Sequence, residues 1–305
     1  SNRVTVLRDG IRVDSCETAG CTRADLARMM VGREVILKPE RAEVQRGEVR
    51  LAIKNLHAES DREMPALRGV DLELYCGEIL CLAGVSGNDQ RELAEVITGL
   101  RPATQGQIVL EGKDVTGYLP GALTEEKLAY IPEERMKDGI IQDFTVAENE
   151  ILREHGREPF ARNGFQNLKA VAEHADKLIK DFQIKTPSRD TRAKNLSGGN
   201  IQKVVLAREL SREPRVLVAA QPTRGVDIGA IEFIHRKLVA LRDAGAGILL
   251  VSVELEEILS LSDRIVVMFE GRIVGEVAAS RADEQLLGLM MANAHTPDTA
   301  TVGVA

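Results

Sequence analysis

Apolar residues along the chain alternate between short continuous runs and runs with helical spacing. Three largely apolar runs, at 79–83, 215–220 and 247–252, predict strands buried on both faces, as in a parallel sheet. Apolar residues spaced three and four apart follow each run, which predicts helices. The first helix would carry one apolar face, made by Leu93, Val96, Ile97 and Leu100. This repeated strand–helix order predicts an α/β fold with a mixed or parallel sheet.

Alternating apolar positions predict a second, antiparallel β subdomain beside this core. Residues 49–56 and 70–74 have the pattern of two strands, separated by a loop at 57–65. A stretch with three glycines at 104–119 surrounds another short apolar run and predicts a hairpin. We expect these strands to cover one side of the core.

Helical spacing dominates the middle of the chain and predicts a helical subdomain at about 140–200. A hairpin at 264–277 and a helix near 283–292 then close the domain. Residues 293–305 lack an apolar pattern, and we expect them to be disordered.

An internal repeat links the two ends of the chain. Residues 1–10 match residues 262–271 without a gap, at a constant offset of 261. The same offset pairs three residues of the following helix, Leu26 with Leu287, Met29 with Met290 and Met30 with Met291. We therefore expect residues 1–33 to be the C-terminal tail of a preceding, similar domain. Without the sheet of that domain, their two strands should pack irregularly, stay mobile or pair with another molecule at an exposed edge, and should not join the central sheet. Residues 34–48 would be a linker and residues 49–292 a second domain.

Composition narrows the class of protein. The chain has 305 residues, 44% of them hydrophobic, and a formal net charge of −7, which argues against a nucleic-acid surface. No apolar run approaches the roughly 18 residues of a membrane span. The four cysteines form no C-x-x-C pair and have no histidine cluster beside them, so we expect reduced thiols and no metal site.

A glycine-bearing loop follows the first buried strand and precedes a helix, which is the architecture of a phosphate-binding P-loop. The loop contains Gly84, Val85, Ser86, Gly87, Asn88, Asp89, Gln90 and Arg91. An intact loop would read G-x-x-x-x-G-K-[ST], whereas Asp89, Gln90 and Arg91 stand at its last three positions. The lysine that reaches phosphates and the hydroxyl that binds magnesium are therefore replaced. The alternative is that the loop turns tightly for structural reasons only.

A second glycine motif lies at a predicted helix start. Ser197 precedes Gly198, Gly199 and Asn200, and helical spacing begins directly afterwards. We expect Ser197 to cap this helix, and the glycines to let a ligand approach its free N–H groups. The positive end of a helix makes such a place an anion site.

This motif order resembles the signature motif, Walker B strand and D-loop of ABC-type ATPases. The stretch LSGGNIQK precedes a buried strand and then QPTRGVDIGA. Over about residues 1–292 the chain resembles the C-terminal half of ATP-binding subunits of simple-sugar-type ABC importers. Its Ala-Gln-Pro, in place of Asp-Glu-Pro, is most similar to the nucleoside-importer branch. The resemblance implies an ABC-type P-loop ATPase core with an antiparallel β subdomain and a helical subdomain.

The resemblance also implies which catalytic positions are changed. Ala220 and Gln221 stand at the Walker B carboxylates, Glu133 at the Q-loop glutamine and Val253 at the switch histidine. The domain's own site would thus lack its lysine, metal ligands, base and switch, and we expect no ATP hydrolysis there. The signature and D-loop remain, at positions Ser197, Gly198, Gly199, Asn200, Gln202 and Asp227.

In such importers a signature closes over ATP and magnesium held by the other nucleotide-binding domain. The expected partners are therefore a first domain in the same polypeptide, membrane permease subunits and an extracytoplasmic binding protein, at the cytoplasmic face of the membrane. Two alternatives remain. The chain could act as a self-sufficient homodimeric ATPase, or as a soluble, non-transport ABC protein on ribosomes or DNA.

Overall fold

The three largely apolar runs form neighbouring strands of one six-stranded sheet. The computed structural model describes residues 1–8, 10–36, 38–39, 41, 46–85 and 87–293. The sheet order is β14-β13-β5-β12-β11-β8. Its strands are β5 (Ile79–Ala83), β8 (Leu128–Ile131), β11 (Val216–Ala220), β12 (Gly247–Ser252), β13 (Arg264–Phe269) and β14 (Arg272–Ala278). All pairs are parallel except β13–β14, as the sequence predicted for the buried runs.

Alternate residues of β5 pack into two separate hydrophobic cores, one on each face of the sheet, which explains why the strand is apolar throughout. Ile79, Cys81 and Ala83 pack into a core with the helices on one face, whereas Leu80 and Leu82 pack into a core on the other. The first core uses α6 (Gly198–Leu210), α7 (Ile228–Asp243), α8 (Leu255–Leu261) and α9 (Glu284–Met291).

Helix α2 (Gln90–Ile97) lies in the second core and buries Leu93, Val96 and Ile97. The predicted apolar face is one residue too long, because the helix ends at Ile97 and Gly99 adopts a positive φ of 73°. Leu100 lies beyond this turn and is 57% exposed, which corrects its assignment to the buried face.

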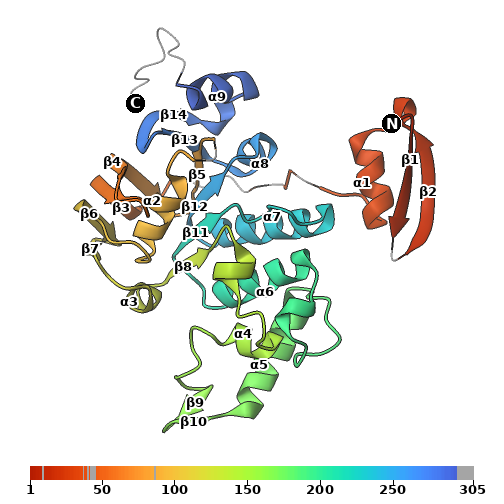
Figure 1. Cartoon of the computed structure of the whole chain (residues 1–305), viewed down its shortest axis with the longest axis horizontal. Helices are drawn as coiled ribbons and strands as arrows, with labels where there is room; N and C mark the ends of the chain where they lie inside the picture. Colours follow the sequence, from red (N-terminus) through yellow and green to blue (C-terminus); the bar gives the residue numbers. More distant parts are fainter. Residues whose placement is uncertain (9, 37, 40, 42–45, 86, 294–305) are drawn as a thin grey trace.

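The second core is covered by a four-stranded antiparallel sheet, as expected (Figure 1). Its order is β4 (Pro65–Tyr75), β3 (Val49–Glu59), β6 (Gln105–Leu110) and β7 (Lys113–Asp114), and α3 (Pro120–Glu125) follows. The predicted loop at 57–65 is too long. Strand β3 continues to Glu59, and only residues 60–64 connect it to β4.

The helical subdomain contains α4 (Val146–Glu150) and α5 (Leu168–Asp181). A π-type turn at Arg135–Gly139 leads into it, and a 3-10 turn at Ala193–Asn195 precedes the signature. The sequence did not predict the small hairpin of β9 (Ala161–Arg162) and β10 (Phe165–Gln166) within this region. The hairpin is too short to leave a period-2 pattern.

The N-terminal unit repeats the geometry of the C-terminal elements. It consists of β1 (Arg3–Arg8), β2 (Ile11–Glu17) and α1 (Arg23–Val31). Both strands begin and end 261 residues before β13 and β14, and α1 begins 261 residues before α9. The irregularity between Val6 and Leu7 recurs between Val267 and Met268, again at this offset. The duplicated sequence therefore forms a duplicated structure.

This unit lies beside the domain and outside its central sheet (Figure 1, red). Within the described residues β1 pairs with β2 alone and is mostly exposed, whereas β13 is almost wholly buried. Helix α1 contacts α7, and the Arg33 guanidinium forms an ion pair of 2.6 Å with the buried Glu232 carboxylate. None of the helices in the described ranges has the length and apolar character of a membrane span. Residues 294–305, where disorder was expected, are outside those ranges.

Candidate functional site

The positions that the sequence assigned to the P-loop, Q-loop, Walker B and switch converge at the carboxyl ends of the parallel strands, where open α/β sheets bind ligands. A cavity of about 700 Å³ lies there. The sequence-predicted residues in its lining are Gly87, Asp89, Gln90, Arg91, Glu133, Ala220, Gln221 and Val253. They follow β5, β8, β11 and β12, except that Ala220 is the last residue of β11, so the four strands bring together motifs that are far apart in the chain. The signature residues and Asp227 are not in this lining.

The loop at 84–91 is packed as a structural turn. A Cβ on Gly84 would lie 2.5 Å from the Gln90 Nε2 atom and 2.7 Å from the Met268 carbonyl oxygen. The Gln90 side chain therefore fills the inside of the loop. Asn88 is buried and donates from Nδ2 to the Met268 carbonyl over 3.3 Å. The predicted position Ser86 lies outside the described residues, and Val85 is half exposed.

Charge in the loop opposes a phosphate. Asp89 stands at the N-cap of α2 with a positive φ of 68° and makes no cap hydrogen bond. Burial and repulsion from Glu92 and Glu270 raise the pKa of Asp89, and Arg68 only partly opposes this. Arg91 points away from the loop to Glu95, with 2.7 Å between Nε and Oε1. The one guanidinium adjacent to the loop in sequence is thus already paired.

The cavity is acidic, which the motif analysis missed. Its described lining carries three arginines and seven carboxylates, namely Asp61, Asp89, Glu92, Glu95, Glu133, Glu134 and Asp138. A formal excess of four negative charges repels a triphosphate. Several of these residues come from turns without a motif, such as Asp61 after β3, so sequence patterns contain no signal for them.

A polar cluster closes the Walker B position against the Q-loop position. Gln221 donates from Nε2 to Glu133 Oε1 over 3.0 Å, and the Arg224 guanidinium binds the same carboxylate oxygen. Ala220 offers no ligand atom at the other Walker B position. The residues present do not fit magnesium-bound ATP, because the hydroxyl, lysine and carboxylates that would hold it are replaced and Glu133 is already bound to a cation.

Arg135 connects this cluster to the signature. It donates from Nη1 to the Arg224 carbonyl oxygen over 2.5 Å and from Nη2 to the Gly225 carbonyl oxygen over 3.0 Å. A Cβ on Gly198 would lie 2.8 Å from Arg135 Nη2, so the guanidinium also lies against the signature glycine. Sequence reasoning missed Arg135, because it is in no recognised motif position.

The signature helix starts with an uncapped first turn. Ser197 is at the N-cap, but its side chain makes no cap hydrogen bond, which corrects the expectation from the sequence. Its Oγ instead accepts from Asn200 Nδ2 over 2.9 Å, and Asn200 Oδ1 accepts from the Lys185 N–H over 2.8 Å. The first N–H groups of α6 are therefore left for a ligand, and a positive helix end beside Arg135 favours an anion.

The D-loop aspartate lies beside the signature of the same domain. Asp227 caps α7 by accepting from the Ala230 N–H over 2.9 Å. A Cβ on Gly199 would lie 2.9 Å from Asp227 Oδ2, so only glycine fits there without a shift. Gln202 is almost fully buried, at 2% exposure, and cannot itself reach a ligand in this arrangement. The predicted site residues thus form two groups, one in the acidic cavity and one at the start of α6.

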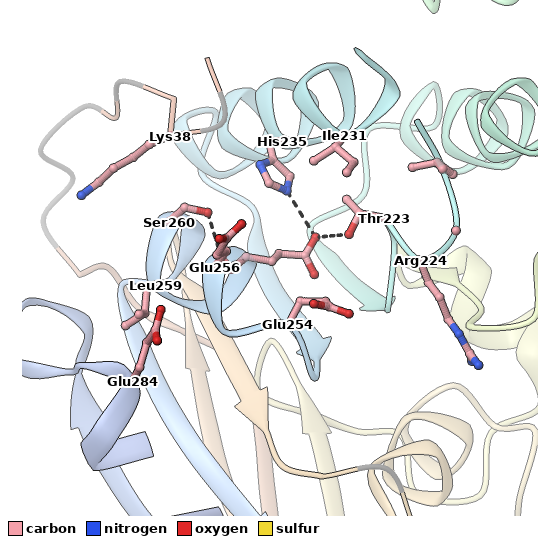
Figure 2. Close-up of a pocket in the computed structure, with 13 residues that line it drawn as sticks. Lys38, Thr223, Arg224, Ile231, His235, Glu254, Glu256, Leu259, Ser260 and Glu284 are labelled. Atoms are coloured by element: carbon pink, nitrogen blue, oxygen red, sulfur yellow. Dashed lines mark hydrogen bonds and ion pairs between the residues drawn. The ribbon is translucent and has the colours of Figure 1, made fainter. Parts of the chain in front are cut away.

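A second cavity, of about 580 Å³, lies on the other side of the loop after β11 (Figure 2). Its floor is a buried polar group. Glu257 Oε1 accepts from Thr223 Oγ1 over 2.7 Å and lies 3.3 Å from His235 Nε2. Helices α7 and α8 therefore hold the loop at Thr223, opposite the side that Glu133 and Arg135 hold.

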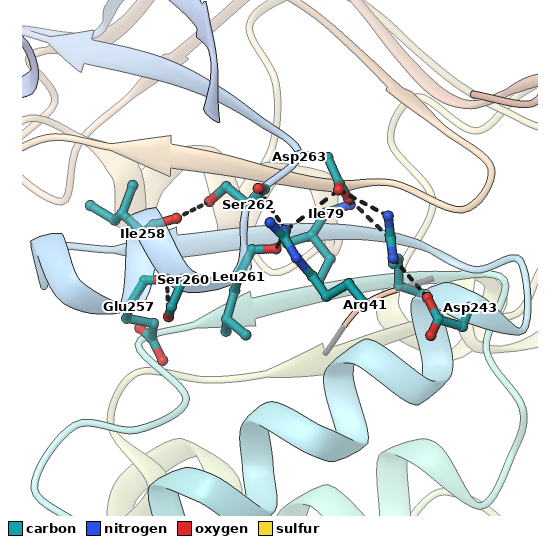
Figure 3. Close-up of polar contacts among 10 residues, drawn as sticks. Arg41, Ile79, Asp243, Glu257, Ile258, Ser260, Leu261, Ser262 and Asp263 are labelled. Atoms are coloured by element: carbon teal, nitrogen blue, oxygen red, sulfur yellow. Dashed lines mark hydrogen bonds and ion pairs between the residues drawn. The ribbon is translucent and has the colours of Figure 1, made fainter. Parts of the chain in front are cut away.

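The linker is attached to the domain near the start of β13. Figure 3 shows Arg41 against the end of α8, where its Nη1 donates to the carbonyl oxygens of Leu261 and Ser262 over 2.7 Å each. Asp263 lies 3.5 Å from the same nitrogen and also accepts from the Ile79 N–H over 2.9 Å. One guanidinium thus connects the linker to the ends of two central elements.

The sequence matches the ABC transporter family model over residues 67–224, just over half of the chain. Together with the six-stranded core, the antiparallel sheet and the signature helix, this match defines an ATP-binding cassette. The chain belongs to the ABC transporter family. Members of this class bind ATP or ADP, and the cassette fold expected from the sequence is confirmed.

The chain is similar over most of its length to ATP-binding proteins of importers. The chain is 43% identical over 291 residues to the guanosine import ATP-binding protein NupO of Bacillus subtilis (strain 168), and 40% identical over 291 residues to the nucleoside import ATP-binding protein NupA of Lactococcus lactis subsp. cremoris (strain MG1363). The matches cover 95% of this chain but 57% and 58% of those proteins. A nucleotide-free ATP-binding cassette from an ABC transporter matches with a TM-score of 0.64 and 25% identity, over 80% of this chain and 95% of that one.

Proposed function

We propose that this chain is the second nucleotide-binding half of an ABC importer ATPase, and that it supplies its signature to ATP held by a first half. The observation that carries the proposal is an asymmetry between the two groups of site residues. In the chain's own cavity, Gln221, Glu133 and Arg91 are paired with protein groups, whereas the start of α6 keeps free N–H groups. Such donors stabilise charge on a transferring phosphoryl group without acting as a base.

The repeated structure supports the presence of a first half. β1, β2 and α1 duplicate the elements that end this cassette, and β1 leaves exposed most of the positions that β13 buries in its sheet. A preceding cassette would offer β1 a parallel neighbour, as β5 does for β13. The chain also spans a little under three fifths of NupO and NupA, which leaves room in proteins of that length for another cassette.

The position of the N-terminal unit agrees with a signature that faces this first half. A Cβ on Gly229 would lie 3.7 Å from the Val31 side chain, so α1 touches the first turn of α7. That helix is capped by Asp227, which lies against Gly199 of the signature. The end of the first half would therefore lie next to the signature and D-loop, with its ATP and magnesium at the interface.

The transported substrate and the remaining partners follow from the relatives. NupO and NupA are named as guanosine and nucleoside import proteins, and other relatives as ribose or glucose import proteins. We infer a nucleoside or sugar substrate, membrane permease subunits, an extracytoplasmic binding protein and a location at the cytoplasmic face of the membrane. No nucleic acid is part of this function.

The test compares the two groups of site residues in the polypeptide that carries both halves. Gly198→Asp places a negative charge in the first turn of α6, where it repels a phosphate, and its Cβ also displaces the Arg135 guanidinium, which would lie 2.8 Å away. We expect hydrolysis to fall by about tenfold or more, as for loss of an oxyanion donor. Gln90→Ala in the chain's own cavity is the matched variant and leaves hydrolysis within about twofold. The reverse pattern would show that the chain's own cavity does the chemistry.

A further inference from the structure

We propose that Glu133, Gln221 and Arg224, here called the Glu133 latch, hold the signature in its working position without nucleotide or metal in this domain's own cavity. The inference rests on the proposed function and deepens it, because it names positioning residues for hydrolysis at the other half's ATP. Nothing in the latch touches that ATP. It acts through the loop at 221–227 and through Arg135.

One carboxylate oxygen of Glu133, at the Q-loop position, binds two residues at and after the Walker B position. Glu133 Oε1 accepts from Gln221 Nε2 over 3.0 Å and from the Arg224 guanidinium. The backbone of Gln221 is in the left-handed region, with φ of 45°, and residues other than glycine adopt this conformation at a cost in free energy. Its N–H donates to the Val251 carbonyl over 2.8 Å. The side-chain and backbone bonds together fix the place where β11 turns into the loop.

Arg135 connects the Glu133 latch to the signature. Arg135, two residues after Glu133, donates to the carbonyl oxygens of Arg224 and Gly225 and lies against Gly198. The guanidiniums of Arg135 and Arg224 repel each other, and burial together with this repulsion lowers the pKa of Arg135. The Glu133 carboxylate binds Arg224 and offsets one of these two positive charges, so its removal leaves both uncompensated. Removal of this carboxylate should therefore disturb the signature more than removal of Arg224.

Glu257 holds the loop at 221–227 from the side opposite the Glu133 latch. Thr223 is 8% exposed and donates to the buried Glu257 carboxylate over 2.7 Å. Asp227 at the end of the loop lies against Gly199. Because Thr223 is fixed, a substitution at Gln221 or Arg224 should shift the loop at 221–227 relative to the signature. The loop and the signature should not move together as one body. The latch and the Thr223 contact thus hold the loop from two sides.

The side chains of the Glu133 latch are partly exposed, so substitutions there should change the position of the loop with little change in the stability of the fold. The Arg224 side chain is 58% exposed and Glu133 is 27% exposed, and exposed ion pairs contribute little to folding. The chain contains a matched pair for comparison. Arg215 lies before the same strand, is 59% exposed, and binds Glu111, which is 25% exposed, over 2.6 Å. Arg215→Ala removes a surface pair of similar exposure at the start of β11, although Glu111 keeps a second partner in Arg50.

The first experiment measures hydrogen exchange in this chain without nucleotide. The reporters are the amides of Lys137 and Asp138 in the turn after Glu133, and of Ile201 at the start of α6, which are all hydrogen-bonded. Arg224→Ala should speed their exchange up to about fivefold, and Glu133→Gln by more, since local opening follows the lost pair energy. Arg215→Ala should leave them unchanged. Equal exchange in Arg224→Ala and Arg215→Ala overturns the latch, whatever the function of the protein.

The second experiment uses the polypeptide with both halves. Arg224→Ala should lower kcat by about threefold to tenfold with little change in KM for ATP, because the signature is misplaced and the first half's binding loop is untouched. The charge exchange of Glu133→Arg with Arg224→Glu should restore most of the rate. Failure of the exchange to restore it, with altered amide exchange in both single variants, shows a steric role and overturns the latch. A rate insensitive to both Arg224→Ala and Gly198→Asp rejects the proposed function instead.

Discussion

Gln221 donates its side-chain amide to Glu133 over 3.0 Å, and this bond joins the Walker B position to the Q-loop position directly. Here the amide and the Arg224 guanidinium satisfy the carboxylate, so the chain closes this part of its site with its own side chains. Gln221 therefore supplies the amide donor that the Glu133 carboxylate accepts, which a glutamate at this position could not do.

Restoring the Walker B carboxylate alone should not restore hydrolysis. Gln221→Glu would place a second carboxylate about 3 Å from Glu133, where like charges repel. The P-loop lysine and hydroxyl would still be replaced by Gln90 and Arg91. We expect ATP turnover of the isolated chain to stay at background and its Tm to fall slightly at pH 7. A coupled phosphate-release assay checks this, and turnover above a matched Gln107→Glu surface control would contradict it.

Gly84 should contribute to the stability of the fold and not to phosphate binding. Gly84→Ala puts a Cβ 2.5 Å from Gln90 Nε2 and 2.7 Å from the Met268 carbonyl, and backbone atoms of β13 cannot yield cheaply. We expect a loss of about 1–3 kcal/mol in the free energy of unfolding, measured in urea. Gly288→Ala is the control, because no heavy atom lies within 4 Å of its Cβ and it is inside α9. It should leave stability unchanged or raise it by up to ~1 kcal/mol.

Glu150 should make stability fall as pH rises. Its carboxyl is 1% exposed with no hydrogen-bond partner among the described residues, and burial raises its pKa well above the usual value, with Arg208 opposing and Glu209 adding. The folded state thus prefers the neutral acid. Stability is greatest below the unfolded pKa of about 4.3 and declines as pH rises towards the folded one.

Glu150→Gln keeps the shape of the neutral acid and should remove this decline. We expect the variant to gain Tm over the wild type between about pH 5 and pH 8, and the difference to shrink on acidification. Glu173→Gln on the exposed face of α5 is the control and should shift Tm equally at all pH values. A Glu150→Gln difference that is constant with pH would show that the carboxyl is ionised in the folded protein.

Arg33 should hold the N-terminal unit to α7. Burial opposes ionisation of Glu232, but hydrogen bonds from the Arg33 side chain and the Ile36 backbone lower the pKa of this carboxyl. Arg33→Ala leaves the 3% exposed carboxylate without its cation. Limited proteolysis should then cut within residues 34–48 several-fold faster. Arg23→Ala breaks only a pair of side chains that are 90% and 72% exposed, and it should leave the cutting rate unchanged.

Fold and motifs were predictable where a residue's role depends on its neighbours in sequence. The buried strands, the P-loop position, the signature and the duplicated ends all appear as local patterns. Ser197 shows the limit, because Asn200 competes for its hydroxyl and no pattern encodes that choice. Arg135 and Asp61 show another limit, since they reach the site only through turns whose tertiary placement sets their contacts. The same applies to Leu100, which a single turn at Gly99 moves from the core to the surface.

Calorimetric titration of this chain with ATP and magnesium, with phosphate release followed in the same sample, shows whether its own cavity is a nucleotide site. The acidic cavity, the filled loop around Gln90 and the paired Glu133 predict neither saturable binding nor turnover. One-to-one binding that is lost in Gln90→Ala, accompanied by phosphate release, would contradict the account. It would show that the cavity at the ends of the parallel strands is an active nucleotide site.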